Sequence, residues 1–372
     1  MRIFTSVLLV LTLFLLGFFS ACIEPVNPTD KYEVIYVTSD ITTPTTWVTE
    51  KAYVIQKSNF EVSAELTIEA GAVVKFSSSN AYLTLTGDGK ITAVGTDASP
   101  IVFTSLKDDD NGGDSNGDDD ASVAAAKDWG TIDLNGTSGS VFTYCEFRYG
   151  GMGFNPEATL ELSNGATAQI ENCKFIHNGG GAKQSGNITS YVGALHAGDA
   201  SKETIIRNNT FYHNDLPLTI FAEIDLDNTN TFSNYSTGNT YNGIFVNGLN
   251  IMKTTHWQET EVAFVITAFD LAIQEPYKLV LGNDVVLKFV NTGRLNCGGG
   301  VSALENYNGS GVQYTSFKDD ERKGDTNGDG MNSSPAEADW LGVFLDDFKA
   351  GNYADWPNIH YDDPNAVVKK DM

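Results

Sequence analysis

The stretch Leu66–Phe76 reads LTIEAGAVVKF: two short runs of apolar and β-branched residues joined by a glycine turn. Three similar runs follow closely, YLTLTG at 82–87, KITAVG at 90–95 and PIVFT at 100–104. Short runs rich in Val, Ile, Thr and aromatic residues, bounded by glycine, are typical of β-strands. The sequence therefore predicts an all-β fold.

A repeated line favours a solenoid over a sandwich. YCEF ends at Phe147, NCKF at Phe175 and NNTF at Phe211. Residues two apart point to the same side of a strand, so each phenylalanine shares a face with the residue two positions earlier. Stacked coils align like with like. The expected result is a phenylalanine ladder beside a ladder of Cys145, Cys173 and Asn209.

The sequence also contains a duplication on a larger scale than the coil repeat. TSLKDD at 104–109 recurs as TSFKDD at 315–320, and GDSNGD at 113–118 recurs as GDTNGD at 324–329. Both matches are offset by 211 residues. We predict two β-helix modules: a long one at 47–250 with an acidic loop at 107–120, and a short one at 251–372 with an acidic loop at 318–330. They form either one continuous solenoid or two rods.

The N-terminus predicts export. An apolar stretch at 3–19 is followed by Ser20-Ala21-Cys22. A short apolar segment with small residues before the cleavage point is typical of a secretory signal peptide, and a cysteine directly after it is typical of a lipoprotein. We predict a signal peptide at 1–21 and lipidation of Cys22. An ordinary signal peptide with an incidental cysteine, and an uncleaved anchor helix, are the alternatives.

Residues 22–46 contain several Pro and Thr residues and are expected to form a tether. The residue after Cys22 is Ile23 rather than Asp, which favours the outer membrane, with the protein facing either the cell surface or the periplasm. The full chain carries a formal net charge of −25. Nucleic acid is therefore excluded as a partner, because two polyanions repel each other.

These lines resemble the right-handed parallel β-helix lipoproteins of the Bacteroidetes, which share the pectate-lyase-like fold. The resemblance rests on the coil at 67–76, on PIVFTS at 100–105 running into an acidic loop, on Asp128-Trp129-Gly130, and on NNTF at 208–211. It implies a right-handed parallel β-helix over most of residues 45–350. It leaves function open, because one fold hosts many functions.

The two acidic loops predict Ca²⁺ sites. DTNGDG at 325–330 matches the first half of a calcium loop, in which alternate oxygen side chains converge on the ion. The distal glutamate of an EF-hand is missing, so flanking aspartates are expected to close each site. The expected calcium is structural, and a solvated acidic loop is the alternative. The predicted ligands are Asp108, Asp109, Asp114, Asn116, Asp118 and Asp128 in the first loop, and Asp319, Asp320, Asp325, Asn327, Asp329 and Asp339 in the second.

Two functions remain open. The first is a surface protein whose β-helix binds a polysaccharide or a cell-surface protein, with exposed aromatic residues stacking on sugars. The second is a calcium-dependent polysaccharide lyase or glycoside hydrolase, for which the resemblance implies a basic residue such as Arg148 or Arg207. Both arginines are more simply solvent-facing, so no catalytic residue is assigned. His177 and His213 follow the phenylalanine line at matching positions. They form either a stacked ladder, or a metal or acid-base pair.

Overall fold

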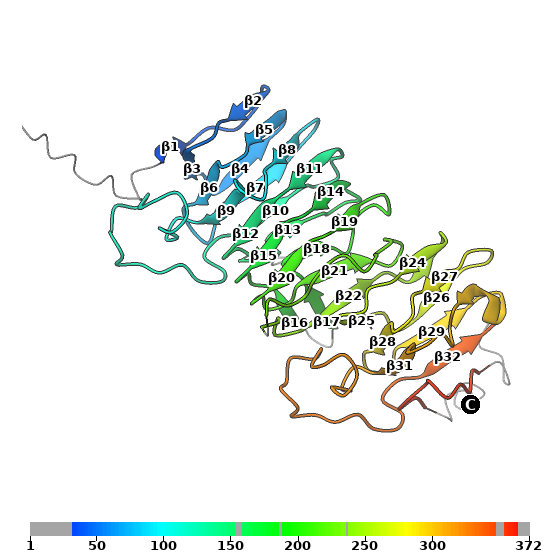
Figure 1. Cartoon of the computed structure of the whole chain (residues 1–372). Coiled ribbons are helices and arrows are strands. Elements are labelled where there is room, and N and C mark those ends of the chain that lie inside the picture. The colour runs from blue at the N-terminus through cyan, green and yellow to red at the C-terminus, as the bar shows by residue number, and fades with distance from the viewer. Residues whose placement is uncertain (1–31, 153–157, 186–187, 236, 347–352, 364–372) are drawn as a thin grey trace, which may run out of the picture.

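The computed structural model describes residues 32–152, 158–185, 188–235, 237–346 and 353–363. These residues form a parallel β-helix, a rod of stacked coils that runs from β1 to β32 (Figure 1). This confirms the predicted all-β solenoid. The predicted signal peptide and Cys22 lie outside the described residues. Among the residues described, no helix is both long and apolar enough to cross a membrane.

Three long parallel sheets form the faces of the first module. The seven-stranded sheet contains, in spatial order, β1 (Glu33–Val37), β3 (Lys51–Ile55), β6 (Val73–Phe76), β9 (Ile101–Ser105), β12 (Cys145–Arg148), β15 (Lys174–Ile176) and β20 (Thr210–Tyr212). The six-stranded sheet contains β2 (Thr45–Trp47), β5 (Glu65–Glu69), β8 (Lys90–Val94), β11 (Ser140–Thr143), β14 (Ala168–Glu171) and β19 (Ile205–Arg207).

The ten-stranded sheet joins the two modules into one continuous solenoid. It contains β4 (Asn59–Val62), β7 (Tyr82–Leu85), β10 (Ile132–Asp133), β13 (Leu160–Glu161), β18 (Leu195–Ala197), β21 (Leu218–Phe221), β22 (Gly243–Asn247), β25 (Ala263–Ile266), β28 (Val286–Phe289) and β31 (Gln313–Ser316). The modules meet where β22 pairs in parallel with β25. Of the two arrangements left open by the sequence, the structure has the single rod.

Smaller sheets complete the second module and one insertion. A four-stranded sheet contains β23 (Asn250–Ile251), β26 (Leu271–Ile273), β29 (Arg294–Cys297) and β32 (Gly342–Leu345), and a three-stranded sheet contains β24 (Thr255–Trp257), β27 (Leu279–Leu281) and β30 (Leu304–Glu305). A short 3-10 helix, η2 (Gly300–Ala303), precedes β30. An antiparallel hairpin of β16 (Gly181–Ser185) and β17 (Ile188–Val192) is inserted before β18.

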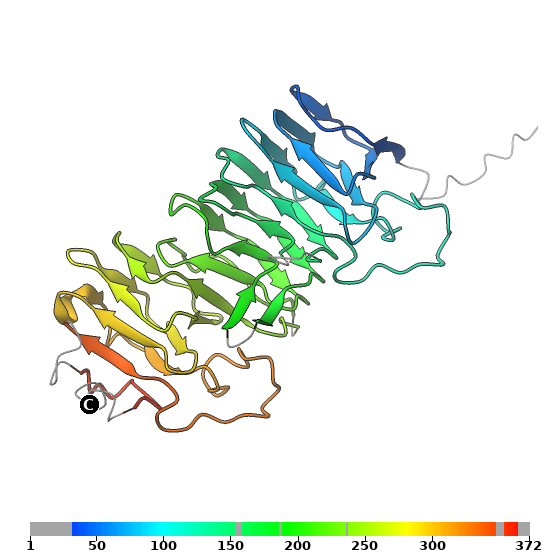
Figure 2. The same ribbon diagram turned by 180° about the vertical axis from the view of Figure 1, so that it is seen from behind.

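The duplicated sequence occupies different sheets in the two modules. TSLKDD begins at the end of β9 in the seven-stranded sheet, whereas TSFKDD begins at the end of β31 in the ten-stranded sheet. The second copy is thus shifted by one sheet around the rod. In both views of the molecule the two acidic loops nevertheless extend from the same flank (Figures 1 and 2).

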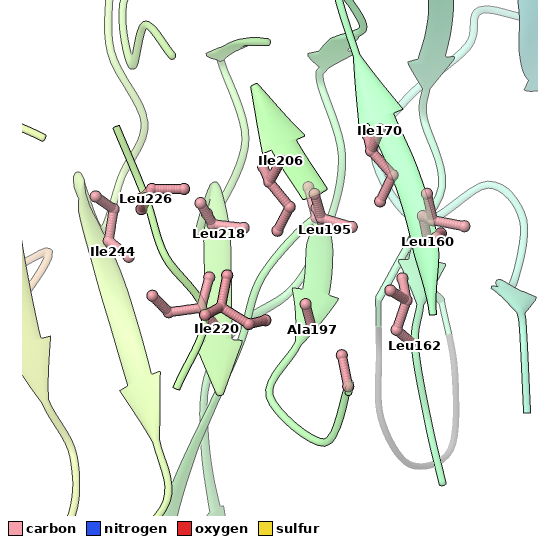
Figure 3. Close-up of a cluster of buried hydrophobic side chains, with 14 of the residues drawn as sticks. Leu160, Leu162, Ile170, Leu195, Ala197, Ile206, Leu218, Ile220, Leu226 and Ile244 are labelled. Atoms are coloured by element: carbon pink, nitrogen blue, oxygen red, sulfur yellow. The ribbon is translucent and has the colours of Figure 1, made fainter. Parts of the chain in front are cut away.

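Like residues stack along the core, as the repeated lines predict. The rings of Phe147, Phe175 and Phe211 stack with centroid separations of 4.8 and 4.9 Å. A second ladder, of Leu160, Leu195, Leu218 and Ile244, follows the ten-stranded sheet (Figure 3). These side chains are fully buried. Each coil therefore buries its apolar face against its neighbours, which is the usual source of stability in a solenoid.

The predicted ladder of Cys145, Cys173 and Asn209 also lies inside the rod. Asn209 donates from its side-chain amide to the carbonyl of Ile170 at 2.9 Å, and its Oδ1 accepts the backbone N–H of Cys173 at 2.9 Å. Its amide is thus satisfied inside the rod, where an unpaired polar group would be costly. Cys145 and Cys173 are buried free thiols.

The β-helix includes part of the predicted tether at one end and a covering segment at the other. β1 lies within the predicted tether at 22–46 and β2 begins in it, and the two form the first coil, because Glu33–Val37 pairs with Lys51–Ile55. At the other end, Ile359 pairs with Tyr314, and the ring of Trp356 lies 4.2 Å from that of Tyr307. Residues 353–363 thereby cover the last coil.

Candidate metal loops and ligand surfaces

A buried lysine fastens each acidic loop to the outside of the rod. Lys75 on β6 is 0% exposed, and its Nζ donates to the carbonyl oxygens of Asp108 at 2.9 Å and Gly113 at 2.5 Å. Val73, two positions earlier, packs with Ala52 and Val102 in a small cluster outside the main core. The first loop therefore folds back over the outer face of three coils.

The second loop repeats this arrangement. Lys288 on β28 is also 0% exposed, and its Nζ donates to the carbonyl of Gly324 at 2.7 Å and to the hydroxyl of Thr326 at 3.1 Å. Burial lowers the pKa of Lys288 to about 8, against the opposing effect of Asp319, Asp320 and Asp325. Neither lysine is among the site residues predicted from the sequence. The sequence feature that could have identified them is a lysine at the same position of VVKF and VLKF, inside an otherwise apolar run.

An aspartate closes the base of each loop. Asp128 accepts from the Ser105 hydroxyl at 2.9 Å and from the Lys107 ammonium at 2.7 Å. Asp339 accepts from Ser316 at 2.7 Å and from Lys318 at 2.8 Å.

The tryptophan after each of these aspartates enters the core. Trp129 stacks on Phe76 at 4.0 Å, and Trp340 stacks on Phe289 at 4.2 Å. The two loops thus begin and end on equivalent anchors.

Three aspartates converge inside the first loop. Asp109, Asp114 and Asp118 each offer a carboxylate oxygen, and these oxygens all lie within 4.8 Å of one another. Asp114 also shapes the turn, because it accepts the backbone N–H groups of Gly117 at 2.7 Å and Asp119 at 3.0 Å. Oxygens at this separation can be ligands of a single calcium ion, whose Ca–O distances are about 2.3–2.6 Å.

Three side-chain oxygens in this loop lack a hydrogen-bond partner. Asp109 Oδ1, Asn116 Oδ1 and Asp118 Oδ1 are buried and have no hydrogen-bond donor among the described residues. Burial, together with the nearby charges of Asp114 and Asp118, raises the pKa of Asp109 despite the opposing effect of Lys75. A cation would supply both the missing partner and the missing charge.

The second loop has an equivalent trio. Carboxylate oxygens of Asp320, Asp325 and Asp329 lie within 4.8 Å of one another, and Asp320 Oδ1 is buried with no donor among the described residues. Asn327 differs from Asn116 in the first loop, because its Oδ1 accepts the N–H of Asp329 at 3.2 Å.

Of the six aspartates predicted to close the sites, Asp109 and Asp320 belong to the trios, whereas the other four do not. Asp108 is 4% exposed and accepts from the Thr104 hydroxyl at 2.5 Å, and Asp319 is 0% exposed and accepts from Thr315 at 2.5 Å. Asp128 and Asp339 are held at the loop bases by serine and lysine. The four carboxylates are therefore structural anchors around the trios.

The two arginines weighed as catalytic bases face outward, as their alternation with buried residues predicts. Arg148 pairs with Glu146 at 3.1 Å, and Arg207 pairs with Asp227 at 3.2 Å. Lys174 also pairs with Glu146, at 2.9 Å. These cations are neutralised in the structure, whereas a general base must be able to accept a proton from the substrate.

A row of rings crosses three successive coils on the same side of the rod. Tyr149 stacks on His177 with centroids 5.7 Å apart, and His177 lies 4.5 Å from His213. His213 Nδ1 is 3.2 Å from His177 Nε2. All three residues have a left-handed backbone, with φ between 56° and 63°. The ladder is thus formed, and burial together with His213 lowers the pKa of His177.

Comparison with known proteins gives one match. Residues 39–167 match the sequence model of the pectate-lyase-like beta helix domain. No curated protein and no solved structure matches the chain. The segment that matches the pectate-lyase-like beta helix domain is therefore the part of the rod that contains Lys75 and the first acidic loop.

Proposed function

We propose that this protein is a lipid-anchored outer-membrane protein whose β-helix binds a polysaccharide, and whose two acidic loops are stabilised by calcium. The observation that carries the binding role is the ring row of Tyr149, His177 and His213. The rings on successive coils form an extended, half-exposed row that a polysaccharide chain can contact along its length. An elongated solenoid face suits an elongated ligand.

Calcium supports this role by rigidifying the flank from which the loops extend. Each trio of aspartates would hold one ion, and the buried oxygens of Asp109 and Asp118 would be among its ligands. The ion is structural, because each trio is fastened to the rod through a buried lysine. A loop held in this way can present its outer surface to a ligand with little loss of conformational entropy on binding.

The test is a glycan array probed with the soluble protein in the presence of calcium. We expect wild-type protein to retain a subset of polysaccharides, and Tyr149→Ala and His177→Ala to reduce that binding at least tenfold. Tyr235→Ala is the control, because Tyr235 is 98% exposed and lies outside the ring row. Failure of the wild-type protein to retain any glycan, or retention of a cell-surface protein alone, would contradict the proposal.

The same panel tests catalysis. The ion pairs of Arg148 and Arg207 support a non-catalytic role, so we expect no unsaturated or shortened products. Product formation that disappears in Arg148→Ala or Arg207→Ala would establish a lyase or hydrolase instead.

A further inference from the structure

A second polar site lies on the ten-stranded sheet, and it includes none of the six trio aspartates. A cavity of about 380 Å³ opens there between the strand pair β13–β18 and the β16–β17 hairpin. Its wall includes Glu161, Tyr191, His196, Asp199 and Asn247. Ligand pockets in proteins span roughly 300–1,000 Å³, so this cavity can hold a small molecule or the end of a chain.

The coil repeat places the side chains of Glu161 and His196 side by side. Glu161 on β13 and His196 on β18 are register partners in the parallel sheet, and Asp133 on β10 is the partner of Glu161 on its other side. The inserted hairpin forms the opposite wall. Thr219 fixes the hairpin to the sheet, because its hydroxyl accepts the N–H of Gly193 at 3.0 Å and donates to the carbonyl of Tyr191 at 3.2 Å.

The buried groups of this cavity lack partners. Glu161 is 3% exposed and His196 is 8% exposed. Glu161 Oε2 and His196 Nδ1 have no hydrogen-bond partner among the described residues. Such groups are uncommon in native proteins, and each calls for an explanation such as a bound molecule.

The cavity is acidic, and none of the described residues that line it is a lysine or an arginine. Burial, followed by the charges of Asp133 and Asp199, raises the pKa of Glu161 to about 9. Burial lowers the pKa of His196 to about 4, so this imidazole is neutral at pH 7. Burial also raises the pKa of Tyr191 to about 12, so its phenol is neutral as well. The titratable groups that face Glu161 therefore supply negative charge and no positive charge.

We propose that this cavity binds the primary ammonium group of a small ligand, with Glu161 as its counter-ion. An ammonium offers three donors and one positive charge, which matches a buried carboxyl beside Asp199. The group can come from a free polyamine or from an amino sugar. This inference rests on the proposed function in one respect: it adds a second ligand site to a rod that we propose is a binding protein.

Binding requires Glu161 to ionise. At pH 7 the carboxyl carries a proton in the free protein, and the ligand's positive charge favours the carboxylate. Each binding event therefore releases close to one proton to the buffer, while the ammonium keeps its own. Affinity for a polyamine, whose primary amines stay protonated in this range, rises as the pH increases from 6 to 8, because less free energy is then needed to deprotonate Glu161.

The experiment is calorimetric titration of the full mature protein with spermidine, with glucosamine and with glucose at pH 7. Repeating it in two buffers of different ionisation enthalpy counts the protons released. We expect binding of spermidine or glucosamine, release of close to one proton, and no binding of glucose. Spermidine alone would identify a polyamine site, and glucosamine alone an amino-sugar site.

Two variants locate the effect. Glu161→Gln should weaken ammonium binding at least tenfold and abolish proton release. Glu259→Gln changes another buried glutamate, outside this cavity, and should leave both unchanged. The inference is overturned if neither amine binds, if glucose binds as well as glucosamine, or if binding releases no proton. These outcomes are independent of the array test of Tyr149, so the two proposals can fail separately.

Discussion

The Nζ atom of Lys75 lies 2.9 Å from the carbonyl oxygen of Asp108, on the outer face of the rod and fully shielded from solvent. An outward-facing lysine would normally extend into water. Here the acidic loop covers it and supplies backbone oxygens as acceptors. Lys75 also donates to the carbonyl of Gly113, and Lys288 donates to that of the equivalent Gly324 in the second module. A buried lysine that donates to loop carbonyls is therefore a duplicated feature of how the loops are held.

Lys75→Met is expected to lower the free energy of unfolding by about 2–4 kcal/mol. The substitution leaves the carbonyls of Asp108 and Gly113 buried without a donor, and an unsatisfied buried group costs about 1–3 kcal/mol. It also removes the positive charge nearest the aspartate trio. Urea unfolding followed by circular dichroism measures the change.

Lys107→Met is the matched control, because Lys107 has a side chain 47% exposed and pairs with Asp128 at the surface. Surface ion pairs contribute about 0–1 kcal/mol, so its effect should be much smaller. Equal effects of the two variants would show that Lys75 is not the main anchor of the loop.

Asp109→Ala is expected to abolish the calcium response of the first loop without destabilising the calcium-free protein. Asp109 Oδ1 has no donor among the described residues, so its loss costs little in the absence of the ion and relieves repulsion from Asp114 and Asp118. Calcium at a hundred times its dissociation constant stabilises by about 2.7 kcal/mol per site. Melting curves with calcium and with chelator measure both effects.

Asp110→Ala serves as the control, since Asp110 is exposed and lies outside the trio. It should keep the full calcium response. Unchanged melting of the wild-type protein on adding chelator would instead identify the loops as merely solvated acidic segments.

The fold could be predicted from the sequence because equivalent residues of successive coils contact one another. Phe147, Phe175 and Phe211 stack on one another, so a pattern along the chain translates directly into contacts. The site was only partly predictable. Spacing brought Asp114 and Asp118 together within one turn, but the partners of Asp108 and Asp128 depend on which way the loop folds back.

The cavity beside Glu161 could not be predicted from the sequence at all. Its floor comes from the coil repeat, yet its wall is the inserted β16–β17 hairpin, which has no counterpart in the part of the second module that the structure describes. Glu161 and His196 are single residues in unremarkable strands of the sequence. Only their register partnership and the position of the hairpin make them one site.

The three thiols of the described chain are expected to be unreactive in the folded protein. Cys145, Cys173 and Cys297 are buried, and burial raises the pKa of Cys145, and that of Cys297 to about 12. The thiolate is the reactive form. A chromogenic disulfide reagent should therefore label no thiol in native protein and all three in urea. Rapid labelling under native conditions would show that the coils open locally.

Glu259→Gln is expected to stabilise the protein at pH 8 but not at pH 4.5. Glu259 is 0% exposed, and its Oε1 accepts the N–H groups of Thr260 at 2.8 Å and Glu261 at 2.9 Å. Burial raises its pKa from 4.5 to about 7, with smaller opposing effects from those two hydrogen bonds. A glutamine can keep both hydrogen bonds through its carbonyl oxygen.

The direction of the pH effect follows from linkage. The folded protein holds the Glu259 proton more tightly than the unfolded chain, so its contribution is fully present below pH 4.5 and is lost as the pH rises to about 7. The loss amounts to about 3 kcal/mol, and Glu259→Gln should remove it. Urea unfolding of both proteins at several pH values measures the difference. Glu305→Gln, at a side chain 53% exposed, should show no such trend. Parallel wild-type and Glu259→Gln profiles from pH 4.5 to 8 would mean that Glu259 ionises freely in the folded rod.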